Sequence, residues 1–157
     1  MLFNDNTLQR FWAKVNKNGP LFDGTPCWLW TAYLDPEGYG RLFYVDAQHY
    51  AHRISYEMLV GPIPIGLTID HLCRVRHCVN PLHLEPVTRG QNVLRGSGYA
   101  ATNARATHCP QNHPYDETNT LIERTKMGAF TRRRCKTCRR IYQRKWRQSV
   151  KLRRVLT

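Results

Sequence analysis

Long apolar runs are missing from this sequence of 157 residues. A helix that crosses a bilayer needs about 20 consecutive apolar residues, so the sequence predicts no membrane partner. Residues 1–14 are polar and mixed, without the apolar stretch of a secretory signal. We therefore expect a cytoplasmic protein.

Acidic residues are scarce, and the last 27 residues have none. The chain has 24 Lys and Arg against 11 Asp and Glu, which gives a formal net charge of +13. Residues 131–157 hold 12 of the basic residues, so residues 1–130 carry 12 basic and 11 acidic side chains. A polyanion, most commonly nucleic acid, is the partner that such a segment predicts. A tail that only aids solubility or adheres to ribosomes is the alternative.

Six cysteines are present, and in the cytoplasm paired cysteines favour zinc sites over disulfides. They fall into two groups of three, each with a histidine nearby. One set is Cys109, His113, Cys135 and Cys138, with the spacings Cys-x₃-His and Cys-x₂-Cys. Structural zinc prefers four tetrahedral nitrogen and sulfur ligands, so this set predicts a zinc module. Free thiols beside a surface histidine are the alternative.

The other set consists of Cys27, Cys73, Cys78 and, five residues further on, His83. A zinc here would staple a chain whose hydrophobic content of 41% allows only a modest core. Cys27 is distant in sequence, and spacing alone does not establish its contact with the others. A buried thiol beneath the neighbouring tryptophans is the alternative.

The N-terminal half has a mixed pattern of helices and strands. Residues 8–15 and 49–60 have apolar side chains at helical spacing. Residues 27–33 and 39–45 are rich in aromatic and aliphatic side chains, and a turn lies between them. We therefore expect a helix, a β-hairpin and a second helix.

A strand, a loop, a second strand and a helix follow. Residues 67–70 and 83–87 are the predicted strands, and the loop between them is rich in Cys, Arg and His. The helix is expected over residues 88–94 with Thr88 as its N-cap, because a threonine hydroxyl accepts a backbone N–H of the first turn. Together these elements predict a ββα unit.

Composition divides the chain into three parts. Residues 1–96 hold the predicted strands and helices, and residues 97–108 have few large apolar side chains, as expected of a linker. Residues 109–157 form a second zinc module. Residues 138–152 of this module have apolar side chains at helical spacing among arginines, which predicts a basic helix.

One motif combines these features: Ile69-Asp70-His71-Leu72-Cys73, then Cys78, Asn80-Pro81-Leu82-His83 and Asn92. It resembles the core of an HNH endonuclease, more specifically the zinc-stapled HNH and His-Cys box variants of homing and phage nucleases. The resemblance covers roughly residues 27–96. It implies an α+β chain with a small zinc-stapled ββα-metal core, an N-terminal helix and hairpin, and a C-terminal zinc module with its basic helix. It also supports Cys27 as the fourth ligand of the first zinc.

The resemblance implies a role for each polar residue of the motif. Phosphodiester hydrolysis needs an attacking hydroxide and relief of charge on the phosphate and the leaving oxygen. His71 matches the general base, which a neutral histidine can be. Asp70 and Asn92 match the ligands of one catalytic Mg²⁺ or Mn²⁺ ion. Asn80 matches the residue that ties the loop together, so the chain is an H-N-N variant.

Three residues keep a second interpretation. His83 could hold the catalytic metal, as in HNH enzymes with two histidines, although Cys73 and Cys78 favour the zinc role. Arg41 and Arg53 are both candidates for contact with the scissile phosphate, and either could equally be a surface arginine.

The sequence therefore predicts a metal-dependent DNA endonuclease, homing-type or phage-encoded, with two structural Zn²⁺ ions. Its partner is double-stranded DNA, and its setting is the host cytoplasm if a phage encodes it. A monomer is favoured over a homodimer, since no dimerisation segment is visible. The residues predicted to bind DNA are Arg132, Arg133, Arg134, Lys136, Arg139, Arg140, Arg144, Lys145 and Arg147.

Two other functions are compatible with the sequence. One is a zinc-dependent DNA-binding regulator with an inactive nuclease core, against which Asp70, His71 and Asn92 argue together. The other is a protein that binds or cuts RNA.

Overall fold

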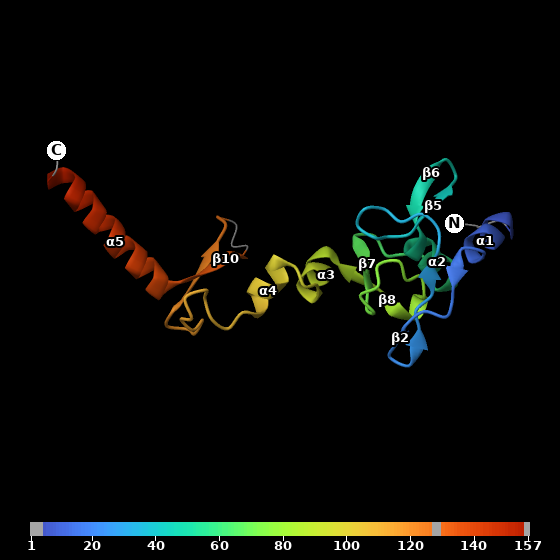
Figure 1. Cartoon of the computed structure of the whole chain (residues 1–157), viewed down its shortest axis with the longest axis horizontal. Helices are drawn as coiled ribbons and strands as arrows, with labels where there is room; N and C mark the ends of the chain where they lie inside the picture. Colours follow the sequence, from blue (N-terminus) through green and yellow to red (C-terminus); the bar gives the residue numbers. More distant parts are fainter. Residues whose placement is uncertain (1–4, 127–129, 156–157) are drawn as a thin grey trace. The chain divides into compact units, whose positions relative to one another are not determined.

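The computed structural model describes residues 5–126 and 130–155, and the chain divides into two compact units. Unit 1 is Met1–Gly96, and unit 2 is Ser97–Thr157 (Figure 1). Both contain helices and short strands, so the chain is a small mixed α+β protein, as the sequence predicted. No helix in the described part of the chain has both the length and the hydropathy of a membrane span.

Unit 1 consists of short elements. In chain order they are α1 (Asp5–Trp12), β1 (Val15–Asn16), β2 (Leu21–Phe22), β3 (Thr25–Pro26), β4 (Leu29–Trp30), β5 (Arg41–Tyr44), β6 (Ala47–Tyr50), α2 (Ala51–Leu59), β7 (Leu67–His71), the 3₁₀ turn η1 (Pro81–His83), β8 (Leu84–Thr88) and α3 (Arg89–Arg95).

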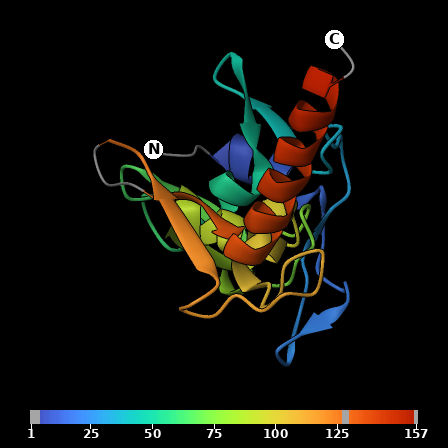
Figure 2. The same cartoon turned by 90° about the vertical axis from the view of Figure 1, so that its left-hand side faces the viewer.

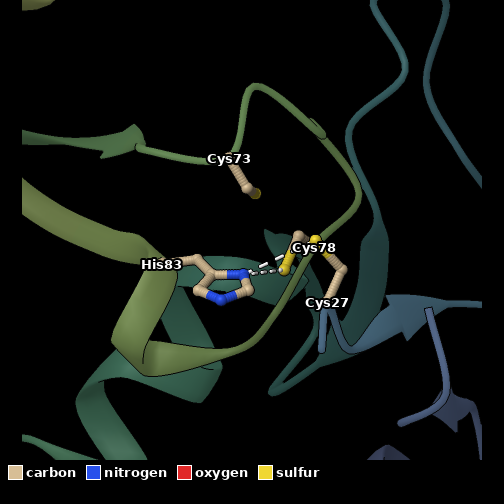
Figure 3. Close-up of side chains that lie close together, drawn as sticks. All are labelled: Cys27, Cys73, Cys78 and His83. Carbon is tan, nitrogen blue, oxygen red and sulfur yellow. Dashed lines mark hydrogen bonds between the residues drawn. The ribbon is translucent and has the colours of Figure 1, made fainter. Parts of the chain in front are cut away.

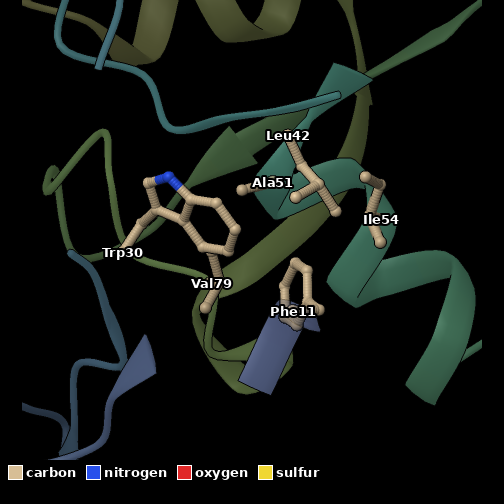
Figure 4. Packing of buried hydrophobic residues seen from close by; sticks show 6 residues of the cluster. All are labelled: Phe11, Trp30, Leu42, Ala51, Ile54 and Val79. Carbon is tan, nitrogen blue, oxygen red and sulfur yellow. The ribbon is translucent and has the colours of Figure 1, made fainter. Parts of the chain in front are cut away.

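A small apolar core holds these elements together. Figure 4 shows its buried members, which come from α1, β4, β5, α2 and the loop before η1: Phe11, Trp30, Leu42, Ala51, Ile54 and Val79. The rings of Phe11 and Trp30 lie 5.1 Å apart. Gly40 packs against the Trp30 indole so closely that an added Cβ would lie 2.6 Å from Trp30 Cδ1. This position therefore requires glycine.

The predicted ββα unit is present. β7 and β8 pair antiparallel from Leu67 opposite Thr88 to His71 opposite Leu84. The Thr88 hydroxyl accepts the Gln91 N–H at 3.2 Å, while the Gln91 side chain accepts the Thr88 N–H at 3.0 Å. This reciprocal pair starts α3 where the sequence predicted. The second strand starts one residue later than predicted, because the 3₁₀ turn includes residue 83.

The predicted hairpin between residues 27–33 and 39–45 is wrong. β5 pairs with β6, and β4 pairs with β1. Between the two predicted strands the Arg41 N–H donates to the Tyr33 carbonyl at 3.0 Å, and the adjoining Leu34 forms an isolated bridge with Gly40. The reason is that the loop after β7 takes the hydrogen bonds of the first segment. The Trp30 N–H donates to a carbonyl of that loop at 2.9 Å, and the Trp28 carbonyl accepts an N–H from it at 2.7 Å.

The two predicted helices of unit 1 are observed with shifted bounds. The first, expected over residues 8–15, is α1 and ends at Trp12, because Val15 pairs in β1. The second, expected over residues 49–60, is α2 and starts at Ala51, because the two preceding residues belong to β6.

Unit 2 consists of α4 (Tyr99–Arg105), β9 (Thr120–Arg124), β10 (Phe130–Cys135) and α5 (Lys136–Val155). The segment expected to be a linker contains α4. The Arg133 guanidinium of β10 donates to the Asn103 and Ala106 carbonyls, which fixes the end of this helix.

The hairpin of β9 and β10 was not predicted. The basic helix, predicted over residues 138–152, is observed as α5, the red helix of Figure 2.

Candidate metal and catalytic site

The first cysteine group and its histidine lie together in unit 1. The ligand atoms of Cys27, Cys73, Cys78 and His83 are all within 4.8 Å of one another (Figure 3). His83 Nδ1 is 3.5 Å from Cys27 Sγ and 3.5 Å from Cys78 Sγ. Tetrahedral ligands at zinc bond lengths are separated by roughly 3.5–3.8 Å. The geometry and the donor types therefore fit a structural Zn²⁺ ion.

Three segments of unit 1 supply the four ligands of this tetrad. Cys27 follows β3, Cys73 and Cys78 lie in the loop after β7, and His83 ends η1. Asn80 joins these segments: its Nδ2 donates to the Pro26 carbonyl at 2.7 Å, and its backbone N–H donates to Cys78 Sγ at 3.4 Å.

Thr25, which the sequence analysis missed, orients the histidine of the tetrad. Its hydroxyl lies 2.7 Å from His83 Nε2 and donates to the Phe22 carbonyl at 3.1 Å. The hydroxyl therefore accepts a hydrogen bond from the Nε2–H group of His83. Nδ1 is then unprotonated and faces the thiols. Outer partners of this kind fix the orientation of metal-binding histidines.

A hydrogen bond between two thiols of this tetrad shifts their pKa values in opposite directions. The Cys78 thiol donates to Cys73, which lowers the pKa of Cys73 to about 5. The same hydrogen bond and burial raise the pKa of Cys78, and burial raises that of Cys27. A bound cation would favour ionisation of all three thiols, because a metal binds the thiolate form.

The second tetrad lies in unit 2. The ligand atoms of Cys109, His113, Cys135 and Cys138 are also within 4.8 Å of one another. His113 Nδ1 is 3.5 Å from Cys109 Sγ and 3.3 Å from Cys138 Sγ, and the two sulfurs are 3.6 Å apart. These separations again fit tetrahedral zinc.

Asn119, a second residue that the sequence analysis missed, supports the Cys135 ligand. Its amide donates to Cys135 Sγ at 3.3 Å and its Oδ1 accepts the Thr137 N–H at 3.0 Å. The pKa of Cys135 is lowered to about 6: burial opposes this shift, but the Cys138 N–H and the Asn119 amide both donate to the sulfur.

His71, the predicted general base, is the last residue of β7 and is 6% exposed. Its Nε2 lies 3.1 Å from the Cys78 carbonyl and must donate to it, because a carbonyl has no proton to give. Nδ1 is then the unprotonated nitrogen. Burial lowers the pKa of His71 to about 4, although the Cys78 hydrogen bond raises it. The imidazole is therefore neutral at pH 7 and can accept a proton.

His52 of α2 packs against His71 and was assigned no role from the sequence. The two rings lie 4.6 Å apart, edge to face, and the Tyr39 ring lies 5.7 Å from His71. Burial lowers the pKa of His52 well below its ordinary value, and its buried Nδ1 has no hydrogen-bond partner among the described residues. The base is thus enclosed by neutral rings. Sequence reasoning assigned His52 no role, because its contact with His71 is tertiary.

Asp70, the predicted metal ligand, is 3% exposed and already paired. Its Oδ1 accepts Arg74 Nη1 at 2.7 Å, and its Oδ2 accepts Arg95 Nη1 at 3.5 Å. Arg95 also pairs with Glu85, which lies opposite Asp70 in the β7–β8 ladder. Two guanidinium groups therefore balance the buried carboxylate.

Asn92, the second predicted ligand, is half-buried on α3, which packs against β7 and β8. Within residues 5–126 and 130–155 its side chain makes no hydrogen bond, so the amide oxygen is available. A carboxylate and an amide oxygen are suitable donors for Mg²⁺ or Mn²⁺. A cation at Asp70 would compete with Arg74 and Arg95.

The structure places both arginines proposed for phosphate contact at one cavity. Arg41 and Arg53 line this cavity of about 240 Å³ together with His49. Arg41 Nε pairs with Asp35 at 2.9 Å, and its guanidinium lies 3.5 Å above the Tyr50 ring. Asp35 and Tyr50 thus hold Arg41 in place at the wall of the cavity.

The nine basic residues predicted to bind DNA fall into two classes. Those near the hairpin have partners within unit 2: Arg132 and Arg134 pair with Glu123, Arg133 lies 4.2 Å above the Tyr115 ring, and Lys136 donates to the Thr118 carbonyl at 2.9 Å. The remaining five are exposed on α5: Arg139, Arg140, Arg144, Lys145 and Arg147.

Comparison with known proteins supports the resemblance of the segment around Asp70, His71 and Asn92 to HNH endonucleases. Residues 49–94 match the family model described as HNH endonuclease. This match confirms the resemblance inferred from the sequence, and it covers α2, β7, the cysteine loop, β8 and most of α3.

Two phage proteins are similar to part of the chain. Protein 7.7 of Escherichia phage T7 is 36% identical over 58 residues, which is 37% of this chain and 45% of the relative. The uncharacterized gene 5.3 protein of Enterobacteria phage T3 is 39% identical over 44 residues, 28% of this chain and 44% of the relative. The matches span less than half the length of either relative. No solved structure matches significantly.

Proposed function

We propose that this chain, which carries an HNH endonuclease domain over residues 49–94, is a metal-dependent DNA endonuclease, homing-type or phage-encoded. One observation carries the proposal. The neutral His71 beside Asp70 has its Nε2 tied to a backbone carbonyl, so that Nδ1 is the available base.

His71 acts as the general base in this proposal. Its Nδ1 takes a proton from a water molecule, and the resulting hydroxide attacks the phosphorus. The Nε2–H group donates a hydrogen bond to the Cys78 carbonyl, which keeps the ring in the required tautomer. His52 and Tyr39, packed against the ring, restrict its rotation.

Asp70 and Asn92 would hold one Mg²⁺ or Mn²⁺ ion. When bound, such a cation neutralises charge on the phosphate and on the leaving 3′ oxygen. Asn80 positions the base indirectly. Its backbone N–H donates to Cys78 Sγ, and the carbonyl of Cys78 accepts from His71.

Two Zn²⁺ ions would have structural roles. The first, on Cys27, Cys73, Cys78 and His83, would fix the loop whose carbonyl orients the base. The second, on Cys109, His113, Cys135 and Cys138, would fix the N-terminal end of α5. Zinc contributes ~10–16 kcal/mol of folding free energy in small zinc peptides, so removal of the first zinc should unfold the loop.

The exposed basic side chains of α5 would bind the phosphates of double-stranded DNA. Phosphate contacts give affinity and register, while base contacts give specificity. The site in unit 1 and the helix in unit 2 would act on one DNA molecule.

A plasmid nicking assay with Mg²⁺ tests the proposal. His71→Ala should lose ~10²–10⁴-fold in rate, because a positioned base contributes about that much. His108→Ala replaces an exposed histidine of unit 2 and serves as the matched control. Equal nicking by His71→Ala and wild type would show that the activity does not come from this site.

A further inference from the structure

The middle of α5 is exposed on every side. All side chains in residues 139–148 are exposed, which is nearly three turns of helix. In Figure 1, α5 leaves β10 as a straight helix, and no other described element of unit 2 lies alongside it. The side chains of this segment therefore do not contribute to the packing of unit 2.

Two aromatic side chains lie on one face of this segment. Tyr142 is 71% exposed and Trp146 is 57% exposed. They are four residues apart, so their rings are neighbours along the helix. The pair is therefore a contiguous aromatic surface that a partner could cover.

Positive charge surrounds the aromatic pair. Arg139 and Lys145 flank it, while Arg140, Arg144 and Arg147 occupy the opposite face. The segment has no acidic residue. A second copy of α5 would bring like charges together, so charge complementarity favours an anionic partner on the aromatic face as well as on the basic face.

We propose that Tyr142 and Trp146 stack on unpaired nucleobases, so that the preferred nucleic acid contains a single-stranded segment. Basic surfaces with interleaved aromatic side chains bind single strands in this way, because every base has a flat face. In a duplex these faces are covered by neighbouring base pairs. The inference rests on the proposed function and names the substrate class: DNA with a gap, fork or displaced strand.

Equilibrium binding of the full-length protein without Mg²⁺ tests this inference. The probes are labelled dT₂₀, rU₂₀ and a 20-base-pair DNA duplex. Trp146→Leu and Tyr142→Leu should each lower affinity for dT₂₀ about 5- to 150-fold, the equivalent of about 1–3 kcal/mol per stacked base. Duplex affinity and its salt slope should stay unchanged, because no charge is removed. Wild-type tryptophan fluorescence should be quenched by dT₂₀, and Trp146→Leu should lose most of this quenching.

Arg144→Gln is the matched control on the opposite face. It should weaken single-strand and duplex binding alike and flatten both salt slopes, by about 0.7 and 0.9 respectively for one lost phosphate contact. Circular dichroism should show the same helix content in all variants.

Three outcomes would overturn the inference. The first is an equal loss of single-strand and duplex affinity in Trp146→Leu, or no loss at all. The second is a loss confined to rU₂₀. The third is a concentration-dependent oligomer in light scattering that Trp146→Leu abolishes, which would assign the aromatic face to a second copy. Since no step requires catalysis, a failure here is distinct from a failure of the nicking assay.

Discussion

At the scale of single residues, Cys78 connects the two halves of the candidate site. Its sulfur belongs to the first tetrad, and its carbonyl accepts the His71 Nε2 proton. Asp70 is fixed just as firmly by Arg74 and Arg95. Asp70 and His71 are therefore buried and held by hydrogen bonds, and the substrate must meet a site in which both are already placed.

The first prediction concerns the pH dependence of cleavage. Burial lowers the pKa of His71 to about 4, so the neutral base predominates above that pH. Cleavage at pH 5.5 should remain close to its value at pH 7. A histidine with the ordinary pKa of about 6.5 would lose roughly tenfold over this range. The measurement is kcat/KM between pH 4 and 8, which reports on the free enzyme.

The lowered pKa of His71 also makes the free energy of unfolding depend on pH. Because the pKa is lower in the folded state than in the unfolded state, the stability contributed by the neutral imidazole is present above about pH 6.5 and is lost as the pH falls through about 4. Zinc content should be measured at each pH as the control, since acid also protonates the thiols. An acid limb of kcat/KM centred near pH 6.5 with zinc retained would contradict the prediction.

At the scale of elements, the ββα unit was predicted well and its surroundings were not. The strands β7 and β8 and the Thr88 cap follow from local patterns. The hairpin assignment failed because β4 bonds to β1 and to the cysteine loop far along the chain. β9 and β10 were missed because β10 contains three consecutive arginines, which hide any alternation of apolar side chains. Sequence reasoning does not detect pairings that depend on distant segments.

The candidate site shows the same division. Counting cysteines and nearby histidines predicted both tetrads, which the structure brings together. Thr25, Asn119 and His52 were missed, because each acts through a tertiary contact with a residue that no spacing rule connects to it. The catalytic roles of Asp70, His71, Asn80 and Asn92 remain predictions.

A second prediction tests how the first zinc loop is held. Thr25→Ala removes the hydroxyl that accepts the His83 Nε2 proton. Zinc affinity of the first site should fall about 10- to 100-fold, which is typical for loss of an outer hydrogen bond to a ligand. The measurement is competition with a colorimetric chelator, which should release one of two zinc ions early.

Thr25→Ser is the matched control, because it keeps the hydroxyl and should release zinc like the wild type. Equal release by Thr25→Ala and wild type would mean that the His83 ring is held by packing alone, for instance against Phe22 at 5.3 Å.

At the scale of the whole molecule, charge is divided between the two units. Residues 1–96 carry nine basic and eight acidic side chains, whereas residues 97–157 carry fifteen basic and three acidic. The unit with the HNH domain is nearly neutral, so nucleic-acid affinity should come mainly from the other unit.

The third prediction is a truncation after Gly96, where unit 1 ends. The fragment should bind one zinc and keep weak Mg²⁺-dependent nicking, while its DNA affinity falls by orders of magnitude. The slope of log affinity against log salt should flatten, because each phosphate contact contributes about −0.9.

A full-length chain with Arg140, Arg144 and Arg147 replaced by glutamine is the comparison. Its slope should flatten by about 2.7 if each arginine makes one phosphate contact. Identical slopes for the wild type, the fragment and the triple variant would show that unit 2 does not touch DNA.

The double use of Cys78 has a further consequence for how this molecule would fail. Loss of the first zinc would release the segment that carries both the Cys78 sulfur and the carbonyl to which His71 donates. Damage to the staple and loss of the base tautomer would then be one event. A cell short of zinc would then hold the proposed nuclease in an inactive form, and not as a folded protein with unguided hydrolytic activity.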